Sequence, residues 1–190
     1  MRPMSTLDTW WAIAVWALGF VLLLSGTGKL RHPLPTALAM AGFGLGGRHR
    51  TAAARALGAV ELALGVGLAG RLALPLALAA TTALFAAFAA LLARALLRGD
   101  RFPCGCFGAD DAMISGRTLV RAALLAVIAF GALVATVAGD AAAAPPLQER
   151  LLTGVVAAGL LALAALAVNV PRLTRWNAEP GPVIRQGGGA

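Results

Sequence analysis

The sequence predicts an all-α fold, a polytopic helical bundle that crosses a membrane four or five times. Hydrophobic residues make up 59% of the 190 residues, against about 45–50% in a soluble domain. The mean hydropathy of the whole chain is +0.82. The apolar residues also fall into runs of roughly 20 residues, the length that crosses a bilayer as a helix. Charged residues cluster between these runs.

The apolar runs define the elements in chain order. They predict an N-terminal segment at residues 1–9 and four spans at residues 10–28, 52–70, 72–97 and 118–138. A further span is predicted at residues 151–170 and a disordered tail at residues 171–190. The first four spans belong to one transmembrane domain at residues 10–140. A short interfacial helix is predicted at residues 35–43, because proline suits the first turn of a helix. Glycines along the second span predict close contact with another helix, and these are Gly58, Gly65, Gly67 and Gly70.

Basic residues gather on one side of this predicted bundle. With five spans, that side carries Lys29, Arg31, Arg48, Arg50, Arg94, Arg98, Arg101, Arg117, Arg172, Arg175 and Arg185, with Arg55 and Arg121 just inside it. The opposite side carries Arg2, Arg71 and Arg150. Cytoplasmic loops carry an excess of basic residues, so this bias predicts an outside N-terminus and places the loop after the third span at the cytoplasmic face. Membrane orientation also explains the net charge of +8, and no nucleic-acid partner is predicted.

The two cysteines of the chain, Cys104 and Cys106, lie in that loop with one glycine between them. Such a pair can close a small, strained disulfide, and strained or exposed disulfides are the labile, catalytic ones. We interpret Cys104, which follows Pro103, as the attacking thiol. Two alternatives stay open. The pair can be structural, or it can bind a metal if His32 and His49 complete the four ligands that zinc normally takes.

Glu61 is a carboxylate in the middle of the second span. A charge inside the bilayer is costly unless it is paired or faces a cavity. Arg121 and Lys29 are the candidate partners, and we predict a Glu61–Arg121 pair that braces the second span against the fourth. The functional alternative is a carboxylate that handles protons or a quinone.

Four short motifs, taken in order, resemble one known family. They are SGTGKLRHP at residues 25–33, AVELALG at 59–65, PCGCFG at 103–108 and GRTLVR at 116–121. Together they resemble the methylamine utilisation protein MauE family, which is related to the DoxX-like membrane proteins. The resemblance covers residues 10–140. It implies that the family-pattern residues here are Lys29, Glu61, Cys104, Cys106 and Arg121.

The resemblance implies a multi-pass protein of the plasma membrane that acts in methylamine metabolism. It implies a role in maturing or exporting the disulfide-rich small subunit of methylamine dehydrogenase, together with a thioredoxin-like partner. The leading hypothesis is a redox-active Cys104–Cys106 pair that exchanges disulfides with that partner or passes electrons to a quinone, with no metal. The alternative is a non-enzymatic assembly or export factor with structural cysteines. Thiols at the cytoplasmic face would serve an exported protein by passing electrons across the membrane. The alternative is that the number of spans before the loop differs by one, which would place the thiols on the opposite side.

Overall fold

The computed structural model describes residues 6–45, 47–100, 102–103 and 113–138. Over these ranges its elements in chain order are α1 (Thr6–Arg31), α2 (Pro33–Gly42), the 3-10 turn η1 (Gly47–His49), α3 (Arg50–Gly70), α4 (Leu74–Arg98) and α5 (Gly116–Val137). Four of these helices, α1, α3, α4 and α5, are long and apolar enough to cross a membrane. The all-α membrane bundle predicted from the sequence is therefore confirmed. The span predicted at residues 151–170 and the tail predicted at residues 171–190 lie outside the described residues.

The connection from α1 to α2 follows from a proline. His32 precedes Pro33, and the residue before proline is disfavoured in the helical region. The backbone of His32 accordingly leaves that region, at φ −129° and ψ 75°. Pro33 then opens α2, because the first turn of a helix does not need the N–H that proline lacks. The short helix predicted at residues 35–43 thus begins two residues earlier, with Pro33 and Pro35 both in its first turn.

The turn between α3 and α4 lies at the opposite end of the bundle from the connection between α1 and α2. Arg71 and Ala73 adopt left-handed backbone conformations, with φ 55° and φ 44°. The Arg71 guanidinium lies 4.7 Å from the centre of the Trp11 ring, a cation–π contact. The Trp11 indole N–H also donates to the carbonyl of Ala132 at 3.2 Å. Trp11 therefore ties α1 both to the α3–α4 turn and to α5.

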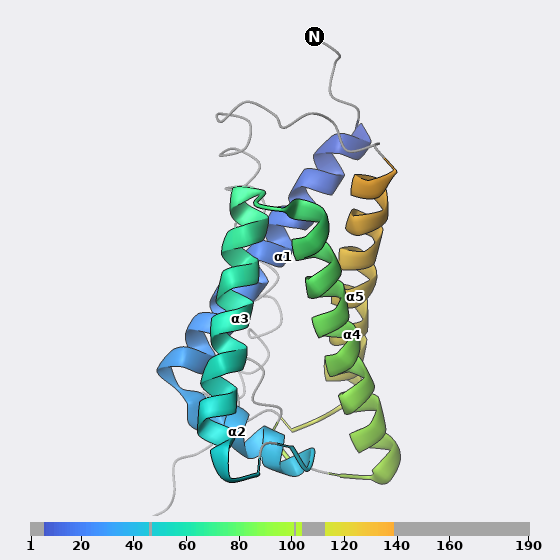
Figure 1. Ribbon diagram of the computed structural model, residues 1–190. Helices are drawn as coiled ribbons and strands as arrows, with labels where there is room; N and C mark the ends of the chain where they lie inside the picture. Colours follow the sequence, from blue (N-terminus) through green and yellow to red (C-terminus); the bar gives the residue numbers. More distant parts are fainter. Residues whose placement is uncertain (1–5, 46, 101, 104–112, 139–190) are drawn as a thin grey trace, which may run out of the picture.

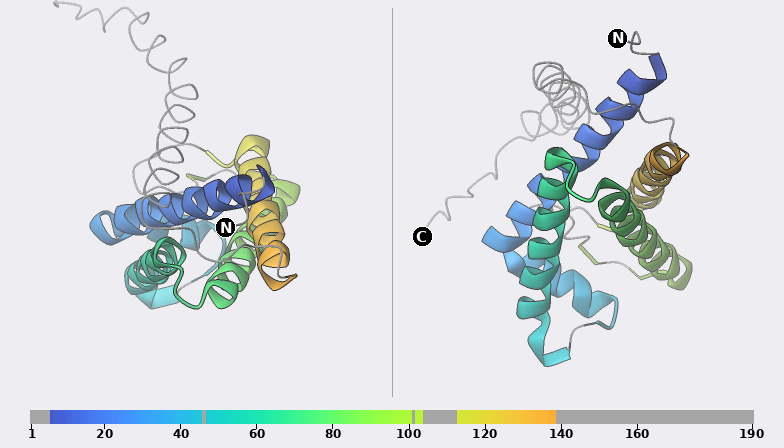
Figure 2. Two further views of the ribbon diagram at one scale, coloured as in Figure 1. Left: turned by 90° about the horizontal axis from the view of Figure 1, so that it is seen from above. Right: turned by 45° about the horizontal axis from the view of Figure 1, so that its top comes forward.

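The four long helices form two closely packed pairs, α1 with α3 and α4 with α5. Figure 1 shows the two pairs side by side, with α2 across the end of the bundle where α3 begins. Contact between the pairs is less extensive than contact within each of them. The view from above in Figure 2 shows α1 running obliquely, so that its N-terminal part reaches α5.

Two apolar clusters fill the interior. The larger one joins all four long helices and consists of Val15, Leu18, Leu22, Leu68, Ala77, Leu78, Ala129 and Ala132. The smaller one, formed by Leu92, Ala95, Ile114 and Ala122, lies where α4 ends and α5 begins. Large apolar side chains such as Val127 and Phe130 of α5 are exposed. Outward-facing apolar surface of this kind suits contact with lipid.

Candidate functional site

One end of the bundle collects the segments around the cysteine loop. The end of α1, the whole of α2, the start of α3, the end of α4 and the start of α5 all lie there (Figure 1). Among the described residues, the basic side chains on these segments are Lys29, Arg31, Arg48, Arg50, Arg55, Arg94, Arg98, Arg117 and Arg121. Arg71 is the one basic residue at the other end within the part of the chain that the structure describes. The first and third loops therefore share one basic end, as the sequence predicts.

The base of the cysteine loop is closed by backbone pairing. Pro103 and Met113 form an isolated antiparallel bridge. The N–H of Ile114 donates to the carbonyl of Phe102 at 3.1 Å. Ile114 is itself buried in the smaller apolar cluster. Phe102 and Pro103 are thus held beside Met113 and Ile114, against the bundle.

An aromatic contact attaches this base to α2. The ring of Phe102 meets that of Phe43 edge to face, with ring centres 4.8 Å apart, an arrangement that aromatic pairs prefer. The same Phe102 ring covers Gly42, where an added Cβ would come within 2.6 Å of the ring. The absence of a side chain at Gly42 is therefore what lets Phe102 lie on α2.

Cys104 and Cys106 lie outside the described residues. The structure describes the residues immediately on either side of this segment, Pro103 and Met113. The predicted redox, metal-binding and structural interpretations of the pair all stay predictions.

Lys29 and Glu61 form an ion pair inside the bundle. The Lys29 Nζ donates to both carboxylate oxygens of Glu61, at 2.9 Å to Oε1 and 2.8 Å to Oε2. It also donates to Ser25 Oγ at 2.6 Å. Lys29 and Glu61 are only 5% and 7% exposed. Three donors of one ammonium group thus meet three oxygens, which is the arrangement that makes a buried charge tolerable.

Glycines on both helices bring this pair together. A Cβ added at Gly26 of α1 would lie 2.7 Å from the carbonyl oxygen of Gly58 and 3.2 Å from the Cβ of Glu61. A Cβ added at Gly58 of α3 would lie 3.0 Å from the Cβ of Lys29. Each glycine therefore makes room for the charged residue of the other helix. The prediction of close contact at Gly58 is confirmed.

The predicted partner of Glu61 is corrected by this geometry. The sequence predicts a Glu61–Arg121 pair, whereas the structure pairs Glu61 with Lys29. The physical reason is that α3 packs against α1, where Gly26 and Gly58 permit the closest approach. The spacing of residues in the sequence indicates this pair, because Lys29 lies three residues after Gly26 and Glu61 lies three residues after Gly58.

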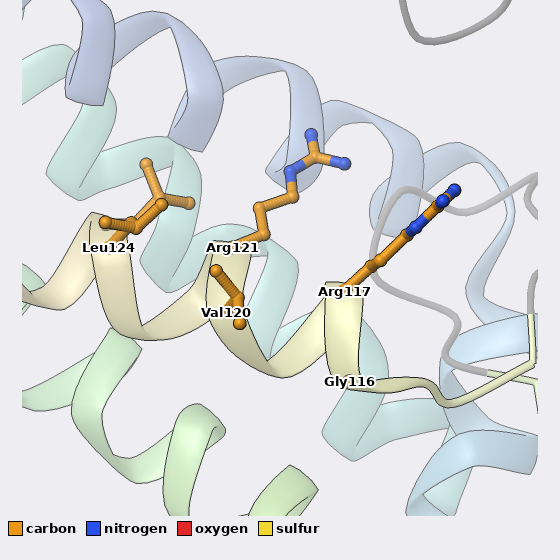
Figure 3. A pocket seen from close by; sticks show the side chains of 6 residues that line it. Gly116, Arg117, Val120, Arg121 and Leu124 are labelled. Atoms are coloured by element: carbon orange, nitrogen blue, oxygen red, sulfur yellow. The ribbon is translucent and has the colours of Figure 1, made fainter.

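Arg121 lies instead on the outer part of α5, in a groove of about 560 Å³. We call it the α5 groove, and its lining residues are Gly116, Arg117, Val120, Arg121, Leu124 and Leu125. Figure 3 shows the side chains of Arg117, Arg121 and Leu124 leaving the same side of the helix. Sequence reasoning singled out Arg121 but not its apolar neighbours.

One family model matches the chain, described as methylamine utilisation protein MauE, over residues 7–138. That range is more than two thirds of the 190 residues. It includes the ion pair, the base of the cysteine loop and the four long helices, apart from Thr6 at the start of α1. Neither a curated protein nor a solved structure matches the chain.

Proposed function

The chain belongs to the methylamine utilisation protein MauE family, and we propose that this multi-pass membrane protein is a thiol–disulfide redox and maturation factor. In this proposal Cys104 and Cys106 exchange a disulfide with a thioredoxin-like partner. The protein that this exchange ultimately helps to mature is the disulfide-rich small subunit of methylamine dehydrogenase. We place the protein in the plasma membrane.

The observation that carries the proposal is the closed base of the cysteine loop. Phe102, Pro103, Met113 and Ile114 attach the two ends of the loop to the basic end of the bundle. A soluble partner can reach such an end without entering the bilayer. The single glycine between Cys104 and Cys106 also limits how far the two thiols can separate. Both properties support exchange chemistry, in which access and strain govern the rate.

The exchange proceeds in two balanced steps. The thiolate of Cys104 attacks one sulfur of the partner's disulfide, so that a mixed disulfide forms and one partner thiolate leaves. The thiolate of Cys106 then attacks the sulfur of Cys104 and releases the second partner thiolate. Two electrons pass from the cysteine pair to the partner, and the two protons lost by Cys104 and Cys106 end on the partner's thiols. The same steps in reverse let a partner dithiol reduce the Cys104–Cys106 disulfide.

Lys29 and Glu61 have a supporting role in this proposal, because their pair fixes the end of α1 from which α2 continues. Arg121 is assigned a supporting role at the start of α5. The basic end would face the cytoplasm by the positive-inside rule. A quinone remains an alternative electron acceptor for the pair, and the test below does not require it.

The proposal is tested by trapping the mixed disulfide. In the Cys106→Ser variant the second step cannot occur, so we expect a covalent complex between Cys104 and the thioredoxin-like partner. The complex should be visible on a non-reducing gel of membranes and should disappear with reductant. Cys104→Ser is the matched control, and it should accumulate much less complex because the attacking thiol is absent.

A second measurement separates redox chemistry from a structural role. The double variant Cys104→Ser/Cys106→Ser should accumulate in the membrane like the parent protein but leave the dehydrogenase small subunit without its native set of disulfides. Full maturation of that subunit by the double variant would overturn the redox function and favour an assembly factor. A membrane-impermeant maleimide applied to intact and permeabilised cells reports the side of the loop. We expect labelling only after permeabilisation.

A further inference from the structure

The outer side of α2 carries large apolar side chains that stay exposed. Leu34 and Leu38 are 65% and 64% exposed. They lie one helical turn apart, and Gly42 follows after another turn, so the three positions share one side of the helix. The buried residues of α2 lie on the opposite side, where the helix packs against α3 and α1.

Phe102 extends this apolar surface toward the cysteine loop. Its ring lies on Gly42, so it continues the line of Leu34 and Leu38. We call these three side chains, Leu34, Leu38 and Phe102, the α2 stripe. Phe102 is two residues before Cys104, and two residues of chain reach at most about 7 Å. A protein that brings a sulfur atom to Cys104 must therefore come close to the end of the α2 stripe.

Exposed arginines stand on either side of α2 in the chain. Arg31 precedes the helix, and Arg48 and Arg50 follow it. The helix itself contains no charged residue. An apolar centre with a charged rim is the usual composition of a protein–protein interface. The positive sign of this rim suits a partner whose own rim is acidic.

We propose that the α2 stripe docks the thioredoxin-like partner, which would present an apolar patch with an acidic rim. The inference rests on the proposed function, because it names the surface by which the same thiol site recognises its partner. Two features favour a protein over lipid. A helix that lies on a bilayer has a strongly charged face opposite its apolar one, whereas the opposite face of α2 is packed against the bundle. The stripe is also small, as in the weak encounters of redox proteins.

Mixed-disulfide formation in the Cys106→Ser variant tests the proposal. Full-length protein in detergent is mixed with the purified thioredoxin-like partner in its disulfide form, and the covalent complex is followed over time on non-reducing gels. Leu34→Asn/Leu38→Asn should slow its formation about tenfold, because loss of a central apolar anchor weakens an interface by a factor of this order. The rate at which a maleimide labels Cys104 should stay unchanged, which would show that the thiol itself is intact.

A matched control changes two leucines at the other end of the bundle. Leu72 and Leu76 are 63% and 72% exposed and are also four residues apart. Leu72→Asn/Leu76→Asn should change the rate of complex formation less than about twofold. Arg48→Glu/Arg50→Glu tests the basic rim and should slow the reaction at low salt, with a smaller effect as salt screens the charges. A control that slows the reaction as much as the α2 variant would overturn the proposal.

A photoreactive phenylalanine in place of Leu38 reads docking without thiol chemistry. In the Cys104→Ser/Cys106→Ser background, reconstituted in vesicles, it should crosslink to the purified partner, whereas the same group in place of Leu76 should not. Crosslinks to lipid alone would overturn the proposal and make the bilayer the occupant of the α2 stripe. Crosslinks to the partner without any mixed disulfide in Cys106→Ser would support docking and overturn the redox function. Full complex formation by the α2 variant would overturn docking and leave the redox function standing.

Discussion

The two helix pairs of the bundle are held together by different means. Between α1 and α3 the backbones touch, since a Cβ at Gly26 would come within 2.7 Å of the Gly58 carbonyl oxygen. Between α4 and α5 side chains do the packing, with Leu92 and Ala122 buried in the contact. The glycine in the middle of α5, Gly131, has no atom within 4 Å of the position of an added Cβ.

This difference indicates where the fold is sensitive to change. Lipid is as apolar as leucine, so helices in a membrane gain little from apolar contact alone and depend on close packing and polar bonds. The α1–α3 pair has both, through its glycines and the Lys29–Glu61 pair. We therefore expect substitutions between α1 and α3 to cost more than comparable substitutions on α4 and α5.

The largest effect is expected from Lys29→Met. This change leaves the carboxylate of Glu61 buried without its cation, and breaking a buried ion pair by removing one partner costs about 3–5 kcal/mol. The free energy of unfolding in detergent micelles measures the loss. Arg31→Met is the matched control, because Arg31 is exposed two residues further along α1. Its effect should stay within about 0.5 kcal/mol.

A double variant sharpens this test. Replacing a whole buried ion pair with apolar residues is often neutral, so Lys29→Met/Glu61→Leu should recover most of the stability lost in Lys29→Met. If Lys29→Met unfolded no more easily than Arg31→Met, the ion pair would not be what distinguishes the α1–α3 contact.

The next largest effect is expected from Gly26→Leu. The new side chain meets the backbone of α3 at Gly58 and Leu62, and overpacking of this kind costs about 3 kcal/mol. Gly131→Leu makes the same change at an open position on α5. It should change stability by no more than about 0.5 kcal/mol. Equal losses from the two variants, measured by thermal unfolding, would remove the contrast between the helix pairs.

Much of the fold could be predicted from the sequence, because hydropathy and length define a span without any knowledge of its neighbours. The predicted partner of Glu61 is wrong, because an ion pair between helices depends on which helices are neighbours. Which helix faces meet depends on packing, and neither hydropathy nor charge specifies it. The matching positions of Gly26 with Lys29 and of Gly58 with Glu61 contain that information, but they gain meaning only once α1 and α3 are known to be adjacent.

The candidate site also has a part that the sequence predicts and a part that depends on the fold. Cys104 and Cys106 were singled out by their spacing alone, which requires no fold. The attachment of their loop to α2 was not predicted, because Phe102 and Gly42 are 60 positions apart. The α5 groove was also missed, since Val120 and Leu124 look like any other apolar residues of a span until Arg117 and Arg121 are placed beside them.

The smallest effect on stability is expected from Phe102→Ala, which concerns the loop between α4 and α5. Phe102 is only half-buried, and an aromatic pair of this geometry contributes about 1 kcal/mol beyond its burial. The unfolding free energy should therefore fall by roughly 1–2 kcal/mol. The rate at which maleimide labels Cys104 and Cys106 should nevertheless rise severalfold, because the loop base loses its contact with α2. Leu97→Ala, at a position that is 89% exposed at the end of α4, should change neither quantity. An unchanged labelling rate in Phe102→Ala would mean that the backbone pairing of Pro103 with Met113 holds the loop without help from α2.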